Sequence, residues 1–102
     1  MKRFLWMSVS VVALVSNVAL ASEDLAKAKG CTACHMATRK LVGPSYKDIA
    51  DRYAQQKGVE DTLTERVRKG SRGAWGAIPM PANAKLTDEE ARALVKWIMT
   101  QK

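Results

Sequence analysis

The sequence predicts an all-α protein with four to five short helices. Three observations favour this class. Apolar residues recur at helical spacing in several short segments, and capping residues, glycines and prolines bound these segments. No run alternates apolar and polar residues as a half-buried strand would, and no internal repeat is visible. The 102 residues allow a single folded domain.

The first 21 residues are typical of a secretory signal peptide. Lys2 and Arg3 give a positive start, an apolar stretch follows over residues 4–15, and Ala19-Leu20-Ala21 resembles an A-x-A cleavage site. A retained membrane anchor is the alternative, but residues 4–21 are only marginally long enough to span a bilayer, and three serines and Asn17 interrupt them. We expect cleavage, export, and a soluble mature domain over residues 22–102.

The first helix of that domain is expected to start at Ser22, whose side chain can cap it, with Glu23 and Asp24 in its first turn. Gly30 ends the regular pattern or allows another element to approach closely. The segment Cys31–His35 follows at once, so this helix delivers it.

A second helix is expected after the breaker pair Gly43-Pro44, because proline suits the first position of a helix. Its apolar residues at helical spacing are Tyr46, Ile49, Ala50 and Tyr53. A third helix should run from about Glu60 to Lys69, where Gly70 stops it.

Residues 70–86 form a long irregular segment that contains three glycines and two prolines. Loops of this length are usually functional or disordered, and the segment is too apolar for a disordered tail. The last helix should begin at Thr87, because Glu90 follows at capping-box spacing. Its apolar face consists of Ala91, Leu94, Val95 and Ile98.

The stretch Cys31-Thr32-Ala33-Cys34-His35 reads C-x-x-C-H, the signature of covalent c-type haem attachment. Each thiol can add across one vinyl group of a haem, and the histidine offers a neutral imidazole to the iron. A dithiol redox motif would need a βαβ pattern, which is missing. A zinc site would need a fourth N or S ligand, and a disulfide would leave His35 unexplained. We interpret the motif as the attachment site of one haem c.

Residues 22–102 are few for an independent hydrophobic core. A buried haem would supply a large apolar plate for the helices to pack around. We therefore expect the chain without haem to be poorly folded.

The second axial position of the iron could be open, as in an oxygen binder or peroxidase, or filled by a protein side chain. That side chain cannot be a histidine, because His35 is the only one. Three methionines remain in residues 22–102. Met36 directly follows His35 and cannot reach the opposite haem face, and Met99 on the last helix suits the core better. Met80 lies in the irregular segment between two prolines, which restrict its backbone. Ligation by His35 and Met80 would leave no open coordination position, which suits electron transfer rather than catalysis.

The chain is basic, with a formal net charge of +7. Such a surface favours acidic partners or anionic membrane surfaces, although it is equally compatible with ordinary solubility charge. We do not expect nucleic-acid binding, because the charges are dispersed and few aromatic residues are interleaved with them.

The chain as a whole resembles a short class I bacterial monohaem cytochrome c of the cytochrome c-551 type. The resemblance spans nearly all of residues 22–102. It is carried by the haem motif together with Val42-Gly43-Pro44, Tyr46-Lys47-Asp48, Trp75-Gly76, Ile78-Pro79-Met80-Pro81 and Lys96-Trp97.

The resemblance implies a fold wrapped around one haem, in which the first and last helices cross and Gly30 lies near Trp97. It also implies roles for four further residues. The Pro44 carbonyl would accept the N–H of His35, unless Pro44 only starts a helix. Trp75 would donate its indole N–H to a haem propionate and Arg66 would pair with the same region; otherwise they are a core tryptophan and a solvated arginine. Asn83 would orient the Met80 thioether, or else serve only as a turn residue.

The function that follows from the resemblance is a soluble periplasmic electron carrier, not an enzyme, expected as a monomer. It would dock transiently with redox proteins, for example a membrane quinol-oxidising complex as donor and a nitrite reductase or terminal oxidase as acceptor. A small haem peroxidase and a fixed electron-entry subunit of a larger enzyme remain as alternatives.

Overall fold

The computed structural model describes residues 8, 10 and 18–102 of the chain. Most of the predicted signal peptide, residues 1–21, lies outside the described residues, so its cleavage stays a prediction. No helix in the described part is long and apolar enough to cross a membrane.

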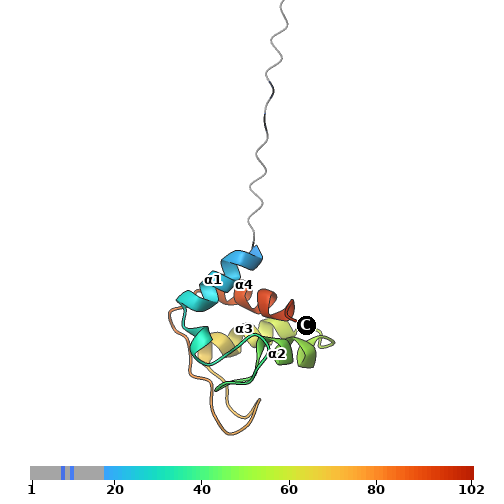
Figure 1. The fold of residues 1–102 in the computed structure, drawn as a ribbon. Helices are drawn as coiled ribbons and strands as arrows, with labels where there is room; N and C mark the ends of the chain where they lie inside the picture. The colour runs from blue at the N-terminus through green and yellow to red at the C-terminus, as the bar shows by residue number, and fades with distance from the viewer. Residues whose placement is uncertain (1–7, 9, 11–17) are drawn as a thin grey trace, which may run out of the picture.

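Four α-helices and one short 3-10 helix form the described domain (Figure 1). They are α1 (Val18–Ala28), η1 (Cys31–Ala33), α2 (Tyr46–Tyr53), α3 (Val59–Lys69) and α4 (Asp88–Met99). Over residues 18–102 there is no β-strand, only two isolated bridges. The prediction of an all-α fold is confirmed.

Helix α4 is the centre of the arrangement, because it packs against α1, α2 and α3. Figure 1 shows α4 between α1 on one side and the pair α2 and α3 on the other. Two clusters of buried side chains lie along it, and the partly buried Val67 of α3 touches both. The first contains Ala26, Leu86, Ala91 and Leu94, and the second contains Tyr53, Val59, Leu63 and Val95. Met99 packs against the second cluster, as expected for a core methionine.

The start of α1 differs from the prediction. The helix begins at Val18, so Ser22 lies inside it and does not cap it. The preceding residues Val-Ala-Leu-Ala are compatible with a helix, which therefore continues across the expected cleavage point. Ser22 is 1% exposed. Its hydroxyl donates to the carbonyl of Ala93 at 3.3 Å and so ties α1 to α4.

Gly30 has a conformational role after α1. Its φ is +79°, a left-handed value that side chains disfavour, and a Cβ added there would meet no atom within 4 Å. Gly30 thus turns the chain from α1 into η1. The alternative, a close approach of another element to this glycine, is wrong.

Capping side chains hold the starts of α2 and α4. Ser45, not Pro44, precedes α2, and its hydroxyl accepts the N–H of Asp48 at 3.0 Å. At α4, Thr87 and Glu90 form the predicted capping box, with both hydrogen bonds at 3.1 Å. Residues 70–86 are irregular as predicted. Figure 1 shows this segment in orange, passing below α3 and returning to the start of α4.

The capping box predicts the cost of one substitution. Thr87→Ala removes the acceptor for the Glu90 N–H, and should lower the free energy of unfolding by about 1 kcal/mol in denaturant titrations. The matched control is Thr62→Ala on the exposed side of α3, where alanine is the better helix former. Equal stability of the Thr87→Ala protein and the natural chain would show that the box does not hold the start of α4.

Candidate functional site

One large cavity brings all of the predicted site residues together. Its volume is about 710 Å³, and it is lined by residues of all four α-helices, of η1 and of the two loops over residues 34–45 and 70–87. All eight residues singled out from the sequence are among the lining residues: Cys31, Cys34, His35, Pro44, Arg66, Trp75, Met80 and Asn83.

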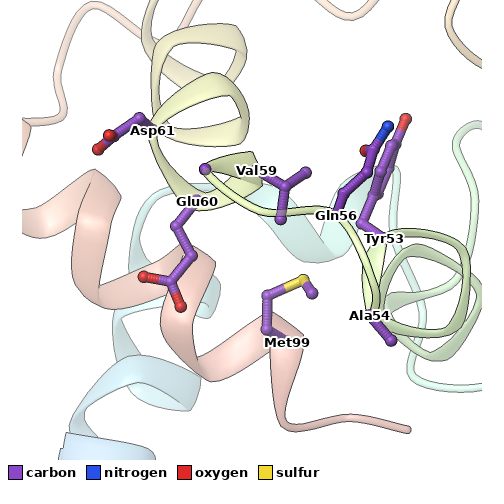
Figure 2. Close-up of a pocket in the computed structure, with 8 residues that line it drawn as sticks. Tyr53, Ala54, Gln56, Val59, Glu60, Asp61 and Met99 are labelled. Carbon is purple, nitrogen blue, oxygen red and sulfur yellow. The ribbon is translucent and has the colours of Figure 1, made fainter.

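A second cavity of about 360 Å³ lies where α2, α3 and the end of α4 meet (Figure 2). None of the eight predicted residues lines it. In Figure 2 the Met99 side chain extends toward Val59, which fits its place in the core. Met99 therefore lies apart from the large cavity.

Cys31 is the first residue of the 3-10 helix η1, and Cys34 directly follows the end of this helix. Both are partly buried free thiols with no disulfide between them. Burial raises the pKa of the Cys31 thiol above its ordinary value, and the neighbouring Cys34 adds to this. Redox-active dithiols work through a lowered thiol pKa. The direction for Cys31 is the opposite of the one that a redox-active dithiol uses.

His35 is held by the loop that precedes α2. Its Nδ1 lies 2.6 Å from the carbonyl oxygen of Pro44. A carbonyl can only accept, so Nδ1 must carry the proton and donate it. The lone pair is then on Nε2, the arrangement that a metal-binding imidazole needs. The contact is the one that the resemblance implies for Pro44.

Gly43 packs against the imidazole ring of His35, a role that the sequence analysis missed. A Cβ at this position would lie 2.6 Å from Cε1 of His35, closer than real side chains approach. The N–H of Gly43 also donates to the Cys34 carbonyl at 2.8 Å. In the sequence Gly43 is visible only as a breaker beside Pro44, because the contact forms only when this loop folds onto the haem motif.

Tyr46 is a second residue whose role in the site was missed. Its ring stacks with His35 at a centroid distance of 5.8 Å and meets the edge of Trp97 at 5.0 Å. Its hydroxyl is buried without a hydrogen-bond partner among the described residues, and burial is the main reason that its pKa rises to about 12. Tyr46 also lines the large cavity, so a neutral phenol is held beside the imidazole.

Met80 is held by a backbone pairing with Ser71 at the base of the irregular segment. The Met80 N–H donates to the Ser71 carbonyl at 2.8 Å, and the reverse bond is 3.0 Å. Gly70 makes this pairing possible, since its φ is +89° and a Cβ there would lie 2.9 Å from the Met80 carbonyl oxygen. Of the three methionines in residues 22–102, all of them described, Met80 alone lines the large cavity. Met36 is 40% exposed at the surface.

The remaining three residues make contacts of other kinds. Trp75 is 38% exposed at the cavity, so it is not a core tryptophan. Arg66 donates to the hydroxyl of Tyr53 at 3.2 Å, and Asn83 donates to the backbone carbonyl of Lys29 at 3.1 Å. The expected contacts of Trp75 and Arg66 with haem propionates, and of Asn83 with the Met80 sulfur, stay predictions.

The residues that line the cavity fit a haem. The volume lies within the roughly 300–1,000 Å³ of small-molecule sites. Aliphatic side chains of α2, α3 and α4 can pack against the apolar haem ring. The two thiols can attach the haem covalently, and the imidazole and the thioether can bind its iron.

An all-α domain with a C-x-x-C-H motif at a cavity of this kind defines a class, the small c-type cytochromes. A family model described as Cytochrome c matches residues 20–102. The chain belongs to the cytochrome c family and has the class I fold. Members of this family are electron carriers that hold a covalently bound haem c.

Individual relatives agree with this assignment. The chain is 52% identical to cytochrome c-551 of Pseudomonas aeruginosa over 80 residues, which are 78% of this chain and 76% of the relative. It is 46% identical to cytochrome c-552 of Hydrogenobacter thermophilus over the full length of both chains. Among solved structures, wild-type cytochrome c552 of Nitrosomonas europaea matches with a TM-score of 0.77 at 46% identity, covering 78% of this chain and 99% of that chain.

The contact between Gly43 and His35 predicts the effect of a single methyl group. Gly43→Ala should push the imidazole away from the loop, lower the free energy of unfolding of the haem-loaded protein by about 2 kcal/mol, and change its visible absorption spectrum. Denaturant titration and absorption spectroscopy measure the two effects.

Gly58→Ala is the control, because Gly58 has a φ of +73° and open space around it. It should cost stability through backbone strain but leave the haem spectrum unchanged. A Gly43→Ala protein with an unaltered spectrum would contradict the role of Gly43 in seating His35.

Proposed function

We propose that this chain is a soluble, periplasmic one-electron carrier whose iron is ligated by His35 and Met80. Cys31 and Cys34 would hold the haem c through thioether bonds. The bound haem supplies a reversible one-electron change of its iron. The proposal is carried by one observation: His35 and Met80 line the same cavity as the two cysteines.

The protein's own residues would keep this centre rigid. Pro44 and Gly43 hold the imidazole with its proton on Nδ1, and the pairing with Ser71 holds the backbone of Met80. A neutral thioether favours ferrous iron and so raises the reduction potential. With both axial positions filled, neither O₂ nor peroxide has a coordination position. This favours a carrier over a small haem peroxidase.

The surface near the cavity supports transient docking with redox partners. Val42 and Ile78 line the cavity and are nevertheless 46% and 67% exposed. Neighbouring Leu41 is 49% exposed. A small apolar surface beside the redox centre, on a basic protein, suits brief contacts with acidic partners. Donor and acceptor would be respiratory complexes, with the carrier monomeric between them.

The location in the periplasm rests on the signal-peptide pattern of residues 1–21. A c-type haem is attached outside the cytoplasm, where such a signal would direct the chain. Export and the haem motif therefore support each other.

The proposal predicts the result of replacing the second ligand. Met80→Ala should remove the absorption band of the Met–Fe(III) bond and open a site for rapid cyanide binding. It should also lower the reduction potential by on the order of 0.2 V, within the roughly 0.8 V range that axial ligands span. Absorption spectroscopy, cyanide kinetics and redox titration measure these effects.

Met36→Ala is the matched control, since Met36 is exposed and does not line the cavity. It should behave like the natural chain in all three measurements. If Met80→Ala also kept the band and the potential, the second ligand would not be Met80 and the carrier proposal would lose its support.

A further inference from the structure

The tip of the irregular segment, residues 72–79, is held differently from its base. The base is closed by the paired hydrogen bonds between Ser71 and Met80. Beyond them, within the described part of the chain, a single hydrogen bond joins the tip to the helices. It runs from Nη1 of Arg52, in the last turn of α2, to the carbonyl oxygen of Ala74, and measures 2.8 Å.

The same guanidinium covers the ring of Trp75. Its Cζ lies 4.2 Å from the ring centroid, well within the range of a cation–π contact. The adjacent Tyr53 meets Trp75 edge-to-face, with centroids 6.1 Å apart and planes at 78°. The indole is therefore fixed by two consecutive residues of α2, one against its face and one at an angle to it.

Arg52 does not line the large cavity, whereas Trp75 and Ala74 do. Arg52 thus acts on the cavity only through the residues that it holds. The other arginine near this aromatic pair, Arg66, donates to the Tyr53 hydroxyl and lies 6.0 Å from the Tyr53 ring centroid. It does not take over the contact with Ala74.

We propose that Arg52 is a positioning residue that fixes Trp75, and with it the tip of the 70–86 segment, at the edge of the haem cavity. An arginine is needed because its planar guanidinium can stack on a ring and donate to a neighbouring carbonyl at the same time. A lysine keeps the positive charge but does not reproduce this double contact. The proposal rests on the proposed function in one respect, namely that the large cavity holds the haem.

The test measures by NMR the solvent exchange of the Trp75 indole N–H in the reduced, haem-loaded protein. The natural chain is compared with the variants Arg52→Gln, Arg52→Lys and Arg72→Gln. Arg52→Gln removes both contacts of the guanidinium. We expect it to accelerate indole exchange about fivefold, the factor that corresponds to the loss of one exposed cation–π contact. Arg52→Lys retains a cation and should fall between Arg52→Gln and the natural chain. The indole N–H of Trp97, in α4, serves as the internal reference, and a Trp75→Phe variant assigns the signal.

Arg72→Gln is the matched control. Arg72 is exposed in the same segment, and within the described residues it makes no hydrogen bond and no ring contact with Trp75. It removes the same charge, and it should leave the exchange rate unchanged. An unchanged rate in Arg52→Gln, or equal acceleration in Arg72→Gln, would overturn the proposal. Equal effects of Arg52→Lys and Arg52→Gln would overturn the contribution of the cation.

The same spectra separate this proposal from the proposed function. The haem ring current shifts the methyl signal of a bound methionine far from its usual position, so that signal reports on ligation by Met80. The exchange of the Trp75 indole reports on Arg52 independently. If Arg52→Gln shows a normal Met80 signal and unaltered Trp75 exchange, only the role of Arg52 is contradicted. If the Met80 signal is missing, the ligation by Met80 is contradicted.

Discussion

The hydrogen bond from His35 Nδ1 to the Pro44 carbonyl is the contact on which the site depends. It fixes the proton of the imidazole on one nitrogen and leaves the other free to bind iron. The loop that supplies this carbonyl is itself tied to the haem motif, through the Gly43 N–H and the Cys34 carbonyl. Because Gly43 has no Cβ, the loop can lie directly against the ring. The loop carbonyl and the ring therefore hold each other in place.

The second side of the site is organised by a different kind of constraint. Met80 is placed by backbone pairing with Ser71, which Gly70 permits through its left-handed φ. Helix α4 joins the two sides, because α1, α2 and α3 all pack against it. The first core cluster lies between α1, which delivers the cysteines, and α4; the second lies between α4 and the helices α2 and α3. Two loops without regular structure can thus present an imidazole and a thioether to one cavity.

Much of this could be predicted from the sequence, because local signals were strong. Helical spacing, the capping box at Thr87 and the stop at Gly70 placed the later helices within a residue or two. The C-x-x-C-H motif and the Pro-Met-Pro segment identified residues that the fold brings to one cavity. What could not be predicted depends on contacts across the fold. Ser22 looks like a cap until α1 is seen to continue through it. The roles of Gly43, Tyr46 and Arg52 depend on contacts with His35 and Trp75, which form only when the chain is folded.

The central claim is that the iron of the bound haem is ligated by the imidazole of His35 and the thioether sulfur of Met80. X-ray absorption at the iron edge of the haem-loaded protein tests it most directly, because scattering distinguishes sulfur from nitrogen and oxygen. The account predicts one sulfur among the iron's nearest neighbours in both oxidation states. A first shell of nitrogen or oxygen alone, in either state, would contradict it.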